Sequence, residues 1–158
     1  MKNAVENGGA LIGLVSRGLP GLPEAGRAPG QLSPLTLAYI GDTVYDLYVR
    51  TLLVETTDAT AHGLHLQAAG RVCAAAQAAA FRRVAPLLTE EEQQVFKRGR
   101  NAHMGSVPKH ASIADYRAAT GLEALLGYLY LSGRDARLTE LMAQILSPGD
   151  APEKKENL

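Results

Sequence analysis

The sequence has one cysteine, Cys73, and no tryptophan among its 158 residues. A single cysteine excludes an internal disulfide, and this scarcity favours a reducing compartment, the cytoplasm. Cys73 lies within the alanine-rich stretch RVCAAAQAAA. We therefore expect it to be a small buried side chain and not a reactive thiol.

Long apolar runs are also missing. No stretch approaches the run of about 20 apolar residues that a membrane-spanning helix needs. The N-terminal ALIGLV is too short for the apolar part of a secretory signal, and glycine and proline follow it in place of a small-residue cleavage site. The sequence therefore predicts a protein without a membrane partner.

The chain has no excess of either charge, because 16 lysines and arginines balance 16 acids. A net charge of zero argues mildly against nucleic-acid binding, which usually leaves a basic balance. Binding needs only one basic face, however, and acids gathered at a metal site would cancel that face in the sum. The charge balance thus leaves open both a nucleic-acid-binding protein and a helical interaction domain with no role in RNA metabolism.

Helix signals begin after a segment rich in glycine and proline. We expect residues 1–31 to be a disordered arm, residues 32–147 to form one domain, and residues 148–158 to be a flexible tail. The domain is long enough for a hydrophobic core.

Five segments of this domain carry helix signals. Ser33 and Pro34 are suited to the N-cap and first turn of the first helix. The second helix is expected over roughly 60–81, and the third begins with the capping-box pair Thr89 and Glu92 and ends near Gly99. After a loop at 100–111, Ser112 can cap the fourth helix, and DARLTELMAQIL predicts the last. No strand pattern is present, which predicts an all-α helical bundle.

Gly41 interrupts the first of these helices. A glycine costs a helix about 1 kcal/mol relative to alanine. We therefore expect Gly41 to permit the close approach of another backbone.

Three acids lie in apolar helical company. Asp42 and Asp46 are four residues apart on one helix face, and Glu123 is the only acid within TGLEALLGYLYL. A carboxylate in a core needs a cation, a hydrogen-bond network or a metal. Each acid could lie at a solvated helix edge or pair with an arginine such as Arg117. Alternatively, Asp42 and Glu123 could converge on Mg²⁺, which prefers carboxylate oxygens.

A basic segment, KRGRNAHMGSVPKH, contains no acid and precedes the helix of Glu123. It holds the basic residues Lys97, Arg98, Arg100 and Lys109, and its Asn101 and Ser106 side chains also suit phosphate oxygens. The alternative is a solvated loop after a helix C-terminus, where cations complement the dipole. His65 lacks the further ligands of a zinc site, so we interpret it as a packed or RNA-facing residue.

Four collinear motifs together resemble a Mini-III ribonuclease, the short branch of the ribonuclease III family that consists of the catalytic domain alone. The motifs are LAYIGDTVYDLYVR, GLHLQAAGRVCAAAQAAA, LTEEEQQVFKRGRNAHMGSVPK and YRAATGLEALLGYLYLSGR. The resemblance covers roughly residues 32–146.

The resemblance implies an all-α, ribonuclease III-like endonuclease domain that forms a homodimer and cleaves double-stranded RNA with Mg²⁺. It assigns Asp42 and Glu123 as the catalytic, metal-binding carboxylates. Two further acids of the wider family pattern are replaced by Ala38 and Thr120. Participation of Asp46 in the metal shell through a water molecule is a hypothesis.

The same resemblance assigns Arg98, Arg100, Asn101 and Lys109 to the RNA backbone. His65 stays an RNA-binding candidate on the residue argument above and not on the resemblance. It also implies that the substrate is a precursor of 23S ribosomal RNA. The missing acids at Ala38 and Thr120 favour one alternative, a catalytically silent RNA-binding or ribosome-assembly protein on the same fold.

Overall fold

The structure is a computed structural model that describes residues 10–16, 19–22, 27–102, 106, 109 and 112–147. These residues form α-helices and two short 3-10 turns, with no strand among them. The helices are α1 (Leu11–Ser16), α2 (Pro34–Thr56), α3 (Ala61–Val72), α4 (Ala74–Val84), α5 (Glu90–Arg100), α6 (Ile113–Leu131) and α7 (Asp135–Leu146), with turns η2 (Pro29–Gln31) and η3 (Ala85–Leu87). The all-α prediction is confirmed.

The predicted caps form as the sequence indicates. The Ser33 side chain accepts a hydrogen bond from the Thr36 amide at the start of α2. Thr89 and Glu92 form a complete capping box at the start of α5, and Ser112 caps α6. These polar contacts satisfy amides that a helix N-terminus leaves without partners.

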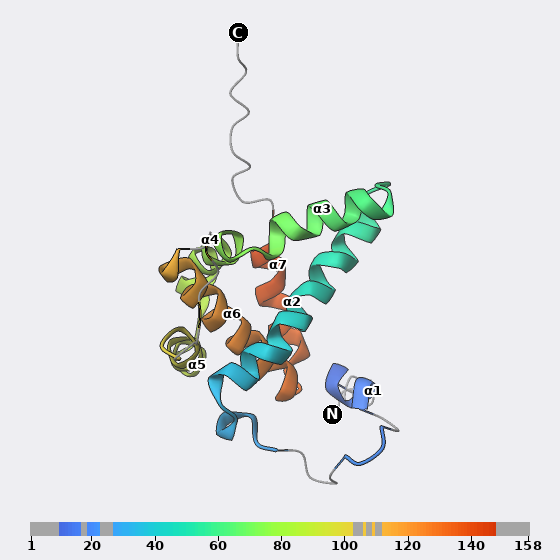
Figure 1. Cartoon of the computed structure of the whole chain (residues 1–158). Helices are drawn as coiled ribbons and strands as arrows, with labels where there is room; N and C mark the ends of the chain where they lie inside the picture. Colours follow the sequence, from blue (N-terminus) through green and yellow to red (C-terminus); the bar gives the residue numbers. More distant parts are fainter. Residues whose placement is uncertain are drawn as a thin grey trace.

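Helix α6 is the centre of the bundle and packs against α2, α4 and α5 (Figure 1). Four of its five leucines are fully buried, which explains why this segment has so little polar character. These leucines are Leu122, Leu125, Leu126 and Leu129.

The backbones of α2 and α6 touch where the two helices cross. A Cβ atom at Gly127 would lie 2.0 Å from the Leu37 carbonyl oxygen, and one at Gly41 would lie 1.7 Å from that of Glu123. Real Cβ atoms do not approach other atoms so closely, so only glycine fits at either position. The predicted close approach at Gly41 is confirmed.

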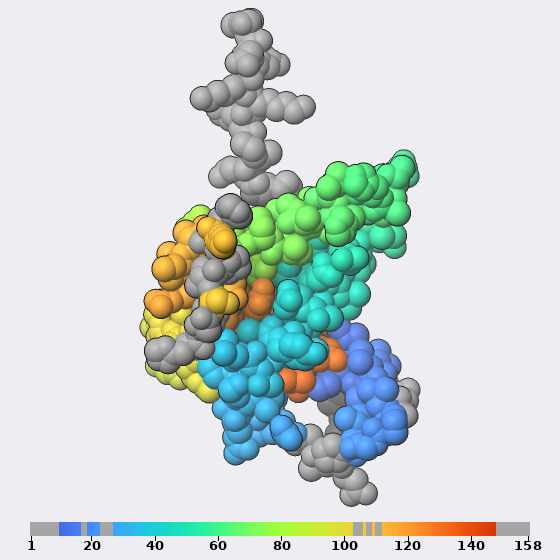
Figure 2. Space-filling view, viewed as in Figure 1, coloured from blue at the N-terminus to red at the C-terminus, as the bar shows by residue number. Residues whose placement is uncertain are grey.

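The single helix expected over 60–81 is wrong, because Cys73 separates α3 from α4. Cys73 has an extended backbone, with φ −65° and ψ 155°, and its side chain is exposed rather than buried. The alanines on its C-terminal side have the highest helix propensity of any residue and give no sign of a break. Beyond Cys73, α4 packs on α6, while α3 extends away from the body of the molecule with the end of α2 (Figures 1 and 2).

Part of the segment expected to be a disordered arm forms α1, which the sequence prediction did not include. Leu11 and Ile12 pack against the core, and the Leu11 amide donates to the Asp135 carboxylate. Residues 1–9 and the expected tail at 148–158 lie outside the described residues.

Within the described ranges, no helix has the length and apolar character needed to cross a membrane.

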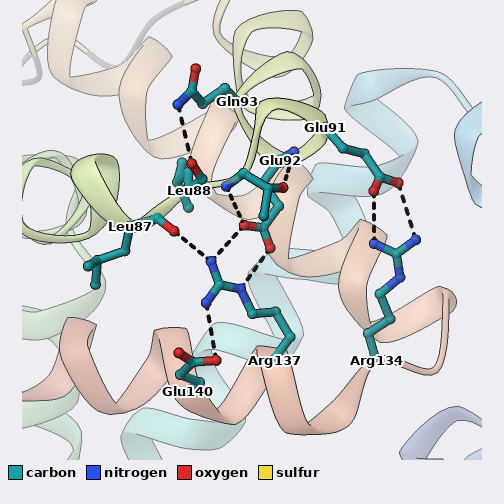
Figure 3. Close-up of polar contacts among 9 residues, drawn as sticks. Leu87, Leu88, Glu91, Glu92, Gln93, Arg134, Arg137 and Glu140 are labelled. Atoms are coloured by element: carbon teal, nitrogen blue, oxygen red, sulfur yellow. Dashed lines mark hydrogen bonds and ion pairs between the residues drawn. The ribbon is translucent and has the colours of Figure 1, made fainter.

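A buried ion pair fixes the start of α5 to α7 (Figure 3). The Arg137 guanidinium donates to both carboxylate oxygens of Glu92, at 2.8 and 2.9 Å, and to the Leu87 carbonyl oxygen at 2.7 Å. Glu92 is 2% exposed. This pair holds in place the helix whose other end carries the basic residues.

Candidate active site

Asp42 from α2 and Glu123 from α6 line one open hollow of about 420 Å³, which we call the carboxylate hollow. The structure therefore brings together the two acids that the sequence singled out. The rest of the lining comes from α2, α6 and the loop between α5 and α6. It consists of Leu35, Ala38, Tyr39, Ser106, Tyr116 and Thr120.

The glycine contact between α2 and α6 explains why these acids share a hollow. Gly41 is in contact with the backbone of Glu123, and Asp42 is the next residue along α2. Two acids that are 81 positions apart in the chain thus lie side by side because a glycine allows their helices to touch.

Glu123 is largely buried, and its carboxylate accepts a 2.9 Å hydrogen bond from Gln77 Nε2. The pKa of Glu123 is raised to about 7: burial is the main cause, the Gln77 hydrogen bond partly opposes the rise, and the negative charge of Asp42 adds to it. Among the described residues, no arginine or lysine forms an ion pair with Asp42 or Glu123. The alternative of pairing with Arg117 therefore has no support here.

Gln77 is a site residue that the sequence prediction missed. It is 2% exposed and lies on α4, within the alanine-rich stretch that also contains Cys73. The sequence signal that could have identified it is a single polar side chain within a run of alanines. Gln77 and Glu123 also line a second hollow of about 530 Å³, together with Cys73 and Asp115, which we call the second hollow.

Ala38 and Thr120 both line the carboxylate hollow beside Asp42 and Glu123. A methyl group and a hydroxyl group therefore line the hollow at the two positions where the resemblance alone predicts that other family members have acids. The Thr120 hydroxyl donates to the Tyr116 carbonyl oxygen at 3.0 Å. In the part of the chain that the structure describes, no group of three or more His, Cys, Asp or Glu residues could hold a metal ion.

Asp46 does not line the carboxylate hollow. Its carboxylate pairs with Arg50 on the next turn of α2, with 2.7 Å between Arg50 Nε and Asp46 Oδ2. This is an i, i+4 pair at the surface. The hypothesis of a water-mediated role for Asp46 stays a prediction.

The four residues expected to contact RNA are all exposed at or beyond the end of α5. Arg100 lies with its guanidinium 5.8 Å from the Phe96 ring centroid and donates to Asn101. Arg98 donates a long hydrogen bond to the Leu32 carbonyl oxygen. Lys109 belongs to the same loop as Ser106, whose side chain reaches the carboxylate hollow.

His65 lies away from this cluster. It is exposed on α3 and lines a separate depression with Arg50 and the last turns of α2. Arg50 is eight residues beyond Asp42, which corresponds to about 12 Å along a helix. The structure therefore does not bring His65 to the two carboxylates.

Comparison with known proteins gives a consistent picture. Residues 35–134 match the model of the ribonuclease III domain family. The chain is 49% identical over 114 residues to Mini-ribonuclease 3 of Symbiobacterium thermophilum, covering 72% of this chain and 88% of that protein. It is 46% identical over 121 residues to Mini-ribonuclease 3 of Brevibacillus brevis, covering 77% of this chain and 90% of that protein.

A crystal structure of a protein from Fusobacterium nucleatum has the same fold. The TM-score is 0.68 at 24% sequence identity, and the match covers 74% of this chain and 93% of the other. At this identity the likeness concerns the fold alone.

Proposed function

The chain belongs to the ribonuclease III family and is an endoribonuclease of that type, and from this premise we propose that it cleaves double-stranded RNA with Mg²⁺ at Asp42 and Glu123. The observation that carries the proposal is the shared hollow. Two carboxylates from different helices face one open space, and no cation among the described residues neutralises them.

These residues fit a magnesium ion. Mg²⁺ is bound in proteins through one or two carboxylates and keeps several of its waters. Asp42 and Glu123 supply that donor set, and the hollow is open enough to hold waters and a phosphate group. A bound cation would also lower the pKa of Glu123, which burial now raises to about 7.

Each group has a defined part in phosphodiester hydrolysis. Asp42 and Glu123 would hold the metal, which when bound supplies an activated water and neutralises charge that develops on the phosphate. Ser106 lines the same hollow and can donate its hydroxyl to a phosphate oxygen. A second carboxylate ligand pair is replaced by Ala38 and Thr120, so waters and RNA phosphates would complete the metal shell.

Arg98, Arg100, Asn101 and Lys109 would contact the RNA backbone. Their exposure at the end of α5, next to the loop that carries Ser106 into the carboxylate hollow, supports this role. Duplex RNA offers mainly phosphates and 2′-hydroxyls, so recognition should depend on shape more than on sequence. Because such contacts release counterions, binding should weaken steeply with salt, and Lys109→Ala should lower the slope by about 1.

The proposal extends to a homodimer that acts in the cytoplasm on a precursor of 23S ribosomal RNA. The resemblance to Mini-III ribonucleases supports the substrate. Exposed Leu35 and Tyr39, the latter 82% exposed, support a dimer, because a second copy would cover this apolar part of α2. Light scattering after size exclusion tests the dimer: Tyr39→Ser should shift the mass toward that of one chain.

The test of the activity compares matched duplex, single-stranded and RNA–DNA hybrid substrates, with Mg²⁺ and with a chelator. We expect cleavage of the RNA duplex in Mg²⁺ only. Binding of duplex without cleavage would instead support the catalytically silent RNA-binding protein. Absence of both binding and cleavage would support an interaction domain without an RNA role.

A further inference from the structure

The Gln77 side chain joins three helices at one buried point. Its Nε2 atom donates to the Val72 carbonyl oxygen at the end of α3 and to Glu123 Oε1 on α6, each at 2.9 Å. Both hydrogens of the amide nitrogen are therefore used. Gln77 itself lies on α4, in the first turn after the break at Cys73.

The orientation of this amide is determined by chemistry. A backbone carbonyl can only accept a hydrogen bond, so Gln77 must turn its NH₂ group, and not its oxygen, toward Val72. The same NH₂ group then faces Glu123 and favours the ionised carboxylate, which can only accept. A rotation of the amide by 180° would place two oxygens against each other at both contacts.

The break at Cys73 makes this arrangement possible. In a continuous helix the Val72 carbonyl would accept a hydrogen bond from the backbone amide four residues later. Here the chain is extended at Cys73, and the carbonyl accepts from the Gln77 side chain. The carbonyl freed by the helix break therefore holds the Gln77 amide, and the same amide nitrogen holds the Glu123 carboxylate.

The amide oxygen of Gln77 is a second observation, independent of the two hydrogen bonds, which indicates that Gln77 has a role beyond stability. Gln77 Oε1 is buried and has no hydrogen-bond partner among the described residues. A buried acceptor without a partner reduces stability, and such groups in native proteins call for an explanation. Gln77 also lines the second hollow, which shares Glu123 with the carboxylate hollow.

We propose that Gln77 is a positioning residue that fixes the Glu123 carboxylate in the orientation needed for metal binding in the carboxylate hollow. This inference rests on the proposed function. Gln77 holds one carboxylate oxygen, Oε1, which would restrict the rotation of the group and leave the other oxygen available to a metal. Partners that orient a ligating side chain typically change metal affinity or activity 10- to 100-fold when they are removed.

The chain provides a matched control for this test. Gln93 on α5 donates from its Nε2 to the Leu88 carbonyl oxygen at 3.3 Å, five residues earlier, as Gln77 does to Val72. Gln93 has the same side-chain-to-backbone bond but contacts no acid in the described structure. Gln77→Met and Gln93→Met therefore both remove such a bond, and only the first removes a partner of Glu123.

The experiment measures Mn²⁺ binding to the RNA-free protein by electron paramagnetic resonance, and single-turnover cleavage of duplex RNA over a range of Mg²⁺ concentrations. For Gln77→Met we expect metal affinity to fall at least tenfold and the half-saturating Mg²⁺ concentration to rise equally. High Mg²⁺ should restore much of the rate. Gln93→Met should match the parent in both measurements.

A purely structural role would lower the maximal rate at every Mg²⁺ concentration and leave metal affinity unchanged, which would overturn the proposal. Parental affinity and cleavage in Gln77→Met would overturn it as well. If Gln77→Met does not fold, Gln77→Asn, which keeps the amide on a shorter chain, takes its place with the same expected loss. A parent protein that neither binds Mn²⁺ nor needs Mg²⁺ would instead overturn the proposed function.

Discussion

Gly41 and Glu123 are in backbone contact, although they belong to different helices. A Cβ atom at Gly41 would lie 1.7 Å from the Glu123 carbonyl oxygen and 2.9 Å from the Gly127 amide nitrogen. The atoms in the way are backbone, which cannot turn aside as a flexible side chain could. The position of Asp42 beside Glu123 follows from this contact, so the geometry of the site depends on the absence of a side chain.

Gly41→Ala should therefore destabilise the protein despite the better helix propensity of alanine. Forcing α2 and α6 apart should cost about 1–3 kcal/mol net, in the range of overpacked cores. Gly70→Ala is the matched control, because Gly70 lies in α3 with nothing within 4 Å of a Cβ atom. It should raise stability by about 0.4–1 kcal/mol. Urea unfolding measures the free energy of unfolding of both variants. Equal values would contradict the conclusion that Gly41 is in tight contact with the α6 backbone.

The raised pKa of Glu123 predicts a pH-dependent effect of Glu123→Gln. The folded state holds this proton more tightly than the unfolded state between the ordinary pKa of 4.5 and about 7. Stability contributed by the protonated carboxyl is thus present below about 4.5 and lost as the pH rises through 7. Glutamine cannot ionise. At pH 8 without metal, the free energy of unfolding of the variant should therefore exceed that of the parent by up to about 3 kcal/mol.

The measurement is thermal unfolding in a chelator at pH 4 and pH 8. The stability advantage of Glu123→Gln should nearly vanish at pH 4, where the carboxyl is mostly protonated in both the folded and the unfolded state. Adding Mg²⁺ at pH 8 should raise the melting temperature of the parent and not that of the variant, because only the parent binds the ion. An advantage of equal size at both pH values would mean that desolvation of Glu123 is not its cause.

The ion pair between Arg137 and Glu92 should matter far more than its neighbour between Arg134 and Glu91. Arg137→Met leaves the Glu92 carboxylate buried without its partner and should cost about 3–5 kcal/mol. Arg134→Met removes a pair whose side chains are both exposed, and should cost about 1 kcal/mol or less. Urea unfolding compares the two, and similar costs would contradict the account.

The same pair predicts sensitivity to acid. Arg137 holds the pKa of Glu92 below its usual range. The stability that the pair supplies is present above the ordinary carboxyl pKa of 4.5 and is lost as the pH falls through the lowered folded value. The gap in unfolding free energy between the parent and Arg137→Met should therefore narrow below pH 4.

Cys73 should report on access to the site. It is exposed and lines the second hollow with Glu123 and Gln77, so a bulky maleimide adduct would fill space beside the carboxylate. We expect N-ethylmaleimide to slow duplex cleavage by the parent, and Cys73→Ser to cleave normally with or without the reagent. Full activity of the stoichiometrically labelled parent would show that the second hollow is not needed by the RNA.

The helices that have local sequence signals were predicted from the sequence. Ser33, Thr89 and Ser112 lie directly before the segments that they cap, and Gly41 stood out as a glycine within a strong helix. The break at Cys73 was missed because the alanines after it fit a continuous helix. Beyond the break, α4 packs on α6, and this tertiary contact is not contained in any local pattern.

The candidate site was predictable to a similar degree. Asp42 and Glu123 were selected as acids in apolar helices, but their meeting depends on the crossing of α2 and α6. Gln77 was missed because a glutamine among alanines gains its role only from a contact 46 residues away. The pairing of Asp46 with Arg50 is local, at i, i+4, and could have been read from the sequence.

The most direct test of the central claim is the single-turnover rate of duplex RNA cleavage in Mg²⁺ by the parent, Asp42→Asn and Glu123→Gln, with duplex binding measured in parallel in Ca²⁺. Each variant should bind the duplex as the parent does and cleave it about 100-fold more slowly, because each loses a ligand of the same metal. A parental cleavage rate in either variant would contradict the claim that these two carboxylates form the active site.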